Sequence, residues 1–400
     1  MHDGARAAAM VTAQIRPPSA EFALMVACTD WPASPERARR IAGAYLAIDG
    51  RWHEFAELLE RHRVLALAVR SIRQAGLAVP RELTARAEAE QTRALSLAAL
   101  SLDCIRVLEE AGVPVVPLKG PWLSDLLYED PAIRHSVDID ILVDWDNFAA
   151  AIALFERRGF RVHGSRPPFG DWRIDPWRRL AKDITLIDPS GRFAIELHHR
   201  LKTPETLLSG LGMAQAGEAL TMGGVRVPAF SREDLFAYLC AHAATSLWDR
   251  LKWLVDIHVL TQDLADDDIV QWQARSERLG TGRCSLLALL LLAEVWGRSL
   301  PPQLAERAGA DQALRGLLKA SRVRLLAKPK RRSGIANSFA RRHILRLRDG
   351  RSYRRAVWFE LVNDRELLER YALVRRLRWL YVPLRVALFL KRKVFGERAL

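Results

Sequence analysis

The sequence has few cysteines and no cysteine pair. Its four cysteines stand far apart in the 400-residue chain, at Cys28, Cys104, Cys240 and Cys284. A disulfide scaffold would need paired cysteines, and a zinc site of the CxxC type would need two of them close together. The sequence therefore argues against both classes and predicts a protein of the reducing cytoplasm.

Long hydrophobic runs are also missing. The longest uninterrupted apolar stretch, residues 286–293, ends at the charged Glu294, whereas a membrane-spanning helix needs about 18 consecutive apolar residues. The first thirty residues include Arg6, Arg16 and Asp30 and lack the apolar core of a signal peptide. These absences predict a soluble cytoplasmic protein and leave peripheral membrane binding open.

Acidic residues are scarce near the C-terminus. Residues 321–400 contain 23 Lys and Arg but only 6 Asp and Glu, whereas residues 1–320 contain 38 and 41, so the C-terminal segment carries the whole net charge of +14. Within it, residues 371–394 mix arginines with Leu, Val, Trp and Phe. Such a segment suits an anionic membrane surface or nucleic-acid phosphates; alternatively, it is a terminal helix that packs its apolar side on the body.

The hydrophobic pattern divides the chain into four predicted regions. After an Ala- and Pro-rich lead-in over residues 1–35, apolar residues at three-and-four spacing predict a helical N-terminal region, 1–111. Short β-branched segments predict an α/β core over 112–228. Helical spacing returns over 229–320, and 321–400 form a basic helical tail. The predicted class is α+β, with a small mixed β-sheet flanked by N- and C-terminal helical regions.

The predicted core contains several strand signals. Residues 113–118 form a short β-branched run, and residues 121–128 begin with a proline, which suits a first helical turn. Residues 137–143 alternate strictly between apolar and polar side chains, which predicts a strand with two different faces. Residues 184–187 and 193–199, separated by a Pro- and Gly-containing turn, predict a hairpin.

Two aspartates lie on the polar face of the alternating strand. Asp138 and Asp140 are two positions apart, so both side chains project from one face, roughly 7 Å apart. Two buried carboxylates are unfavourable unless a cation neutralises them, and oxygen ligands favour Mg²⁺ or Mn²⁺. Alternatively, both aspartates are simply solvated on the polar face of an edge strand.

Other polar residues are placed to join this pair. Lys119 and Gly120 stand between a predicted strand and a predicted helix, where a cation and backbone N–H groups can hold a phosphate. Arg134 lies four residues before Asp138. Glu196 and His198 share the polar face of a later strand, where Glu196 can complete a trio of carboxylates.

The order of these elements resembles a known signature. Residues 118–143 read LKGPWLSDLLYEDPAIRHSVDIDILV, and with the later Glu196-x-His198 they resemble the family of uncharacterised nucleotidyltransferases (nucleotidyltransferase 5), in the polymerase-β-like superfamily. His62-Arg63-Val64, His242 and the segment 251–257 are also similar to family features. The resemblance covers about residues 50–300 and leaves out the basic tail.

The resemblance implies a metal-dependent enzyme. Asp138, Asp140 and Glu196 would hold Mg²⁺ or Mn²⁺, with Glu196 as the base for the acceptor hydroxyl. We expect Lys119, Gly120, Arg134 and His198 at the nucleotide; alternatively, His198 orients Glu196, contacts the acceptor or only packs in the structure. Such an enzyme transfers a nucleoside monophosphate from an NTP to an acceptor (a small molecule, sugar, peptide or protein), and related proteins suggest surface-polysaccharide or peptide natural-product biosynthesis.

Two features support other interpretations. The usual Gly-Ser pair of the superfamily is Gly120-Pro121 here, so the phosphate-binding hydroxyl is missing, which fits an inactive binding module that kept the fold. The basic tail fits a protein that binds nucleic acid or a membrane through residues 321–400. Lys252 and Asp256 have the i, i+4 spacing of an ordinary surface pair; alternatively, Lys252 reaches the base or the phosphates of the nucleotide.

Overall fold

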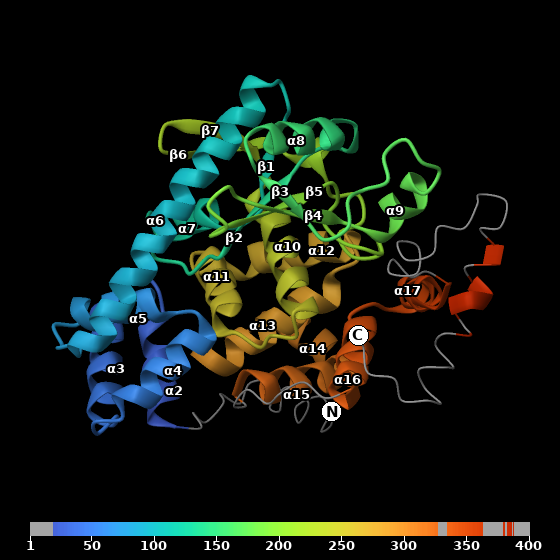
Figure 1. Cartoon of the computed structure of the whole chain (residues 1–400). Helices are drawn as coiled ribbons and strands as arrows, with labels where there is room; N and C mark the ends of the chain where they lie inside the picture. Colours follow the sequence, from blue (N-terminus) through green and yellow to red (C-terminus); the bar gives the residue numbers. More distant parts are fainter. Residues whose placement is uncertain (1–18, 327–333, 363–378, 381, 386, 388–400) are drawn as a thin grey trace.

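A five-stranded mixed sheet forms the centre of the chain (Figure 1). The computed structural model describes residues 19–326, 334–362, 379–380, 382–385 and 387. The strand order is β1-β2-β5-β4-β3, in which β2 and β5 run parallel and the other neighbours antiparallel. The strands are β1 (Val116–Pro117), β2 (Asp138–Leu142), β3 (Arg161–His163), β4 (Asp183–Ile187) and β5 (Ala194–His198). The predicted α+β class with a small mixed sheet is confirmed.

The two faces of this sheet differ as the alternation predicts. Ile139 and Ile141 of β2 are buried with Ile195 and Leu197 of β5, in a core shared with α6 (Arg81–Glu110) and α8 (Trp145–Arg157). The intervening residues of both strands point to the opposite face. A separate hairpin of β6 (Glu218–Met222) and β7 (Val225–Ala229) packs beside β1 and contributes to the same core.

Helices before the sheet form the N-terminal part of the described chain. They are α2 (Ala20–Cys28), α3 (Pro35–Leu46), α4 (Trp52–His62), α5 (Leu65–Gln74) and α6, which runs from these helices up to the sheet (Figure 1). The expected loose lead-in is wrong for residues 20–28, because Phe22, Leu24 and Met25 of α2 are buried. A short helix that is apolar on most sides lacks the amphipathic period by which helices are predicted.

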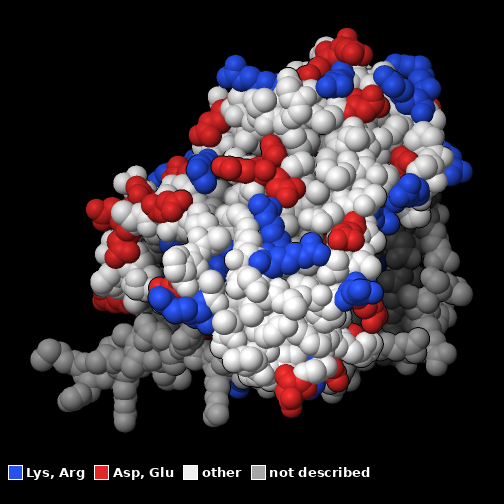
Figure 2. Space-filling view, turned by 90° about the vertical axis from the view of Figure 1, so that its left-hand side faces the viewer, with Lys and Arg blue, Asp and Glu red and all other residues white. Residues whose placement is uncertain are grey.

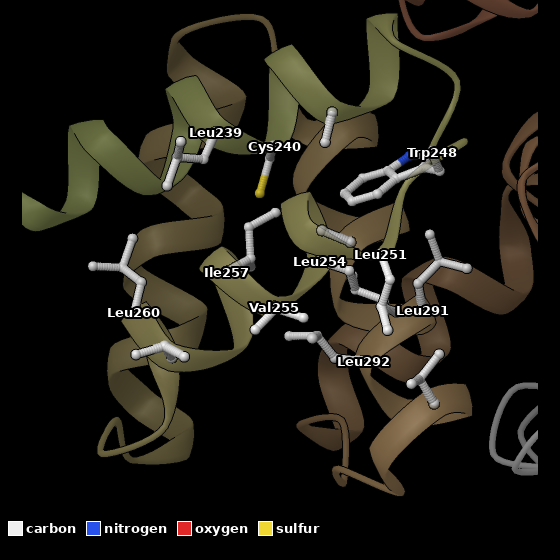
Figure 3. Close-up of a cluster of buried hydrophobic side chains, with 14 of the residues drawn as sticks. Leu239, Cys240, Trp248, Leu251, Leu254, Val255, Ile257, Leu260, Leu291 and Leu292 are labelled. Carbon is white, nitrogen blue, oxygen red and sulfur yellow. The ribbon is translucent and has the colours of Figure 1, made fainter. Parts of the chain in front are cut away.

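Helices after the sheet lie beneath it in Figure 1. They are α10 (Arg232–Thr245), α11 (Leu251–Thr261), α12 (Asp266–Arg278), α13 (Gly282–Trp296), α14 (Pro302–Ala310) and α15 (Gln312–Leu326), while α7 (Pro121–Tyr128), α9 (Ile174–Leu180) and the 3₁₀ turn η1 (Met213–Gln215) belong to the connections within the core. Figure 3 shows apolar side chains of α10, α11 and α13 facing one another, with Trp248 at one end of the cluster. The apolar run of α13 is thus a buried core helix, whose Glu294 pairs with Arg322 of α15.

The N-terminal and C-terminal helices share one hydrophobic core. It joins Phe22 and Leu59, from the first helices, to Phe236 and Leu291 of α10 and α13. Segments distant in sequence therefore support one another on the side of the sheet that carries the polar strand residues. The division of the chain at residues 111, 228 and 320 stays a prediction.

The basic C-terminal segment is described only in part. Two of its helices are α16 (Gly334–Arg346) and α17 (Gly350–Val362), and Phe339 and Trp358 on them are exposed. Residues 328–332, whose sequence KPKRR indicates a linker or an exposed loop, and most of 371–394 lie outside the described residues. Among the helices that the structure describes, none is both long and apolar enough to span a membrane. Binding of this segment to a membrane or to nucleic acid stays a prediction.

The shared core allows a prediction about stability. Leu291 is fully buried in α13, so Leu291→Ala removes apolar contacts and leaves a cavity. We expect it to lower the free energy of unfolding by about 2–5 kcal/mol, measured by urea denaturation. The matched control is Leu46→Ala, at a position that is 79% exposed in α3, which should change stability by less than about 0.5 kcal/mol. Equal effects of the two substitutions would contradict the shared core.

Candidate active site

A cavity of about 340 Å³ lies between the polar face of the sheet and helices α10 and α11. Six of the seven predicted site residues line it: Lys119, Gly120, Arg134, Asp138, Asp140 and Glu196. The seventh, His198, contacts two of these residues. Basic and acidic side chains also adjoin at the surface, near the middle of the face drawn in Figure 2.

Strand pairing brings the carboxylates together. In the parallel pair of β2 and β5, Asp140 lies opposite Glu196, and laterally paired residues of a sheet project from the same face. Asp138, two positions before Asp140, projects from that face as well. All three carboxylates border the cavity. The aspartate pair therefore borders a cavity, and it does not lie on an edge strand, because β2 stands between β1 and β5.

The carboxylate of Asp140 is almost inaccessible to solvent, with 1% of the residue exposed. Lys119 Nζ lies 2.9 Å from its Oδ1, and His198 Nε2 lies 3.3 Å from the same oxygen. Burial alone would raise the pKa of Asp140, but Lys119 and His198 outweigh burial and hold this pKa well below its usual range. Asp140 is therefore ionised. Among the described residues, its second oxygen, Oδ2, has no hydrogen-bond partner although it is buried.

The other two carboxylates are in different surroundings. Burial and the neighbouring Asp140 carboxylate raise the pKa of Asp138, against the opposing charge of Lys119. Glu196 is more accessible, with 32% of its side chain exposed, and its Oε2 lies 3.4 Å from His198 Nε2 and 3.7 Å from Lys182 Nζ. A carboxylate that is partly exposed in a cavity can receive a proton from a bound molecule.

The loop before α7 brings Lys119 to the carboxylates. Gly120, the residue before the helix, has φ +75° and ψ −144°, and a Cβ atom there would lie 3.2 Å from the carbonyl oxygen of Asp138. Both the positive φ and this close approach favour glycine. Pro121 then begins the helix. The tight turn explains how Lys119 reaches Asp140 from a neighbouring segment.

A comparison with known families matches the part of the chain that contains this cavity. Residues 49–297, more than half of the chain, match the family described as uncharacterised nucleotidyltransferase. The chain belongs to this family of nucleotidyltransferases. The comparison confirms the resemblance inferred from residues 118–143.

Two solved structures are also similar to this nucleotidyltransferase. Both are of ANT(2'')-Ia, an antibiotic-resistance factor, one in solution and one in a crystal with adenylyl-2''-tobramycin. Each has 15% identity and a TM-score of 0.34, and the matches cover 46% of this chain and 93% and 98% of the respective other chains. No curated protein matches the chain.

Three family features form one buried network in this nucleotidyltransferase. Arg134 donates two hydrogen bonds to Asp256, of 2.8 and 2.9 Å, in a bidentate pair that is almost wholly buried. The hydroxyl of Tyr128, at the end of α7, interacts with the same carboxylate. Arg134 also borders the cavity, but its guanidinium is largely occupied. The network thus fixes α7 against α11 beside the site.

The expectation that Lys252 and Asp256 form a surface pair is wrong. Both residues are buried; Asp256 binds Arg134, and Lys252 Nζ donates a 3.1 Å hydrogen bond to the carbonyl of His135. Lys252 also borders the cavity, where burial and the nearby Arg134 lower its pKa well below the usual value. Helical spacing predicts which residues share a face, but not whether another element covers that face.

Several cavity residues were not among the seven site residues predicted from the sequence. Arg63 follows the last residue of α4 and has a left-handed backbone conformation, with φ +56°. It borders the cavity. His242 of α10 meets Trp253 of α11 edge to face at 5.7 Å. The similarity of the segments around Arg63 and His242 to the family could have indicated that both residues belong to the site. The additional lining residues include Arg63, His242, Asp249, Arg250, Lys252 and Trp253.

The residues present fit a divalent cation. Asp140, Glu196 and His198 can each offer one ligand atom, and these atoms lie within 4.8 Å of one another. The buried Oδ2 of Asp140 adds an acceptor without a hydrogen bond from any described residue. Asp138 is not part of this closest group, although it borders the same cavity. The identity of the ion, and the ligand set predicted from the sequence, stay predictions.

The buried pair of Arg134 and Asp256 allows a test by a double-mutant cycle. Arg134→Ala leaves the carboxylate of Asp256 buried without its main partner, so we expect a loss of about 3–5 kcal/mol in unfolding free energy. The double variant with Asp256→Ala should be more stable than the sum of the single losses predicts, by at least about 1 kcal/mol. Urea denaturation measures all three variants.

The control for this cycle is an exposed ion pair. Arg86→Ala removes an exposed contact to Glu60 of 3.1 Å and should cost less than about 1 kcal/mol. Strictly additive losses in the buried cycle would show that Arg134 and Asp256 do not act as a unit.

Proposed function

We propose that this protein transfers a nucleoside monophosphate from an NTP to an acceptor hydroxyl, in a reaction that depends on Mg²⁺ or Mn²⁺. One observation carries the proposal. Asp138 and Asp140 of β2 and Glu196 of β5 share one cavity with Lys119 and other cationic side chains. The family to which the chain belongs supports nucleotidyl transfer in general.

The charges of the cavity suit a metal-bound triphosphate. The carboxylates occupy the sheet side, where a divalent ion would offset their mutual repulsion. Arg63, at the end of α4, and Lys119, in the loop before α7, border the same cavity, where they can bind phosphate oxygens. The phosphates of an NTP would neutralise the positive charge of these side chains. Their oxygens would also complete the coordination of the ion.

The chemical roles of the residues follow from this arrangement. A bound ion would stabilise negative charge on the α-phosphate and on the attacking and leaving oxygens. Glu196, whose side chain is 32% exposed, accepts the proton of the acceptor hydroxyl. The acceptor oxygen then bonds to the α-phosphorus, the bond from that phosphorus to the bridging oxygen breaks, and pyrophosphate leaves. Lys119 and Arg63 stabilise the charge on the phosphates.

Because Pro121 stands where the superfamily has a serine, another residue must take over the phosphate contact of the serine hydroxyl. Pro121 supplies neither a hydroxyl nor a backbone N–H, so we assign the contact to Lys119 and the cations around it. Arg134 holds the loop in place through Asp256. An inactive nucleotide-binding module with the same fold is the competing proposal, and it predicts binding without turnover. The acceptor, the preferred base and a role in polysaccharide or peptide biosynthesis stay predictions.

Asp138→Asn tests the proposed reaction. The substitution keeps the shape of the side chain but removes a charge that the ion needs, so we expect labelling of an acceptor to fall by more than about 100-fold. The assay incubates the protein with each of the four α-labelled NTPs, a cell lysate and Mg²⁺ or Mn²⁺, and it detects labelled products. Chelation of the metal should abolish the signal in the unmodified protein.

The matched control is Asp146→Asn. Asp146 is an exposed aspartate in α8, and its substitution should leave labelling unchanged. A parallel thermal-shift measurement separates the alternatives: stabilisation by an NTP only with metal supports the enzyme, whereas stabilisation without any turnover supports the binding module. Full labelling activity in Asp138→Asn would refute the assignment.

A further inference from the structure

His198 lies within ligand distance of the proposed metal site. Its Nε2 is 3.3 Å from Asp140 Oδ1 and 3.4 Å from Glu196 Oε2. Adjacent ligands of a six-coordinate ion with bonds of about 2.1 Å are separated by about 3 Å. Nε2 therefore lies close to the separation of neighbouring ligands from each of the two carboxylate oxygens, and the ligand atoms that the three residues offer lie within 4.8 Å of one another.

The nitrogen faces the site because of its surroundings in the sheet. His198 lies opposite Asp183 in the antiparallel pair of β5 and β4, and its Nδ1 is 3.8 Å from Asp183 Oδ2. Nδ1 has no hydrogen-bond partner among the described residues, and a small movement would bring it within hydrogen-bond distance of Asp183. A carboxylate that accepts a hydrogen bond from Nδ1–H leaves the lone pair of Nε2 free for a metal. Because His198 is 3% exposed, water has little access to either nitrogen.

Asp140 retains capacity for an ion although it already contacts Lys119. An ionised carboxylate offers about four acceptor positions. Lys119 and His198 both approach Oδ1, while the buried Oδ2 accepts no hydrogen bond from the described part of the chain. In the ion-free arrangement, the ammonium of Lys119 supplies the positive charge that the buried carboxylate needs.

We propose that His198 Nε2 is a direct ligand of the ion held by Asp140 and Glu196, and that this nitrogen makes the site prefer Mn²⁺ to Mg²⁺. The proposal rests on the metal dependence of the proposed function. Mg²⁺ favours oxygen ligands and dehydrates reluctantly, whereas an imidazole nitrogen suits transition metals. The alternative is that Nε2–H only donates hydrogen bonds to the two carboxylates and orients them.

Pulsed electron paramagnetic resonance of the Mn²⁺-loaded full chain, without nucleotide, distinguishes a ligand from a hydrogen-bond donor. A coordinated imidazole produces nitrogen modulation of the Mn²⁺ signal, and labelling all histidines with ¹⁵N should change its pattern. This measurement uses the unmodified protein and so does not depend on whether a variant folds. Competition titration should show that Mn²⁺ binds at least about tenfold more tightly than Mg²⁺.

Two variants assign the nitrogen to a residue. His198→Gln should remove the modulation and weaken Mn²⁺ binding at least about tenfold. His242→Gln is the matched control, because His242 also borders the cavity but is not in the group of described residues whose ligand atoms could share an ion. It should retain the modulation.

The outcomes separate this proposal from the proposed function. Mn²⁺ binding that Asp140→Asn abolishes, but that shows no histidine modulation, would overturn the role of His198 and leave the metal-dependent reaction intact. Modulation that persists in His198→Gln and disappears in His242→Gln would likewise overturn it. No Mn²⁺ binding to the unmodified protein would overturn both the histidine ligand and the metal dependence.

Discussion

The parallel pairing of β2 with β5 is the constraint on which the site depends. It sets Asp140 opposite Glu196, and the antiparallel pairing of β5 with β4 then sets His198 opposite Asp183. Side chains alternate between the two faces of a sheet, so a slip of one residue in β2 would turn its aspartates into the apolar core. Ile139 and Ile141, packed with α6 and α8 on the other face, fix the register and thereby the position of the carboxylates.

The buried carboxylates of Asp140 and Asp256 each need a positively charged partner. Both partners come from residues that flank α7. Lys119, just before α7, contacts Asp140, and Arg134, soon after α7, forms the buried bidentate pair with Asp256. A buried charge without a partner is strongly destabilising. Both pairs therefore hold α7 between the sheet and α11, beside the cavity.

The sequence predicts the sheet and its polar face better than it predicts the walls of the cavity. Alternation in residues 137–143 reports a local period, so it correctly separates Asp138 and Asp140 from the isoleucines that are buried. The cavity walls depend on tertiary contacts instead. Lys252 looks like a surface residue because its spacing carries no information about the element that covers α11. Arg63 is distant in sequence from the strands that carry the carboxylates. The hydrophobic period of α4, which ends just before Arg63, does not predict that this residue lies near the sheet.

The shared core explains why residues so far apart meet in one site. Leu59 of α4 and Leu254 of α11 belong to the same hydrophobic cluster, and the buried His62 accepts a 3.0 Å hydrogen bond from the backbone N–H of Leu251, the first residue of α11. Burial lowers the pKa of His62 to about 3, so the ring is neutral and can accept this bond. It ties the end of α4 to the start of α11, and the next residue, Arg63, reaches the cavity. Because the sheet supplies the carboxylates and the helices supply the opposing cations, neither part of the chain forms the site alone.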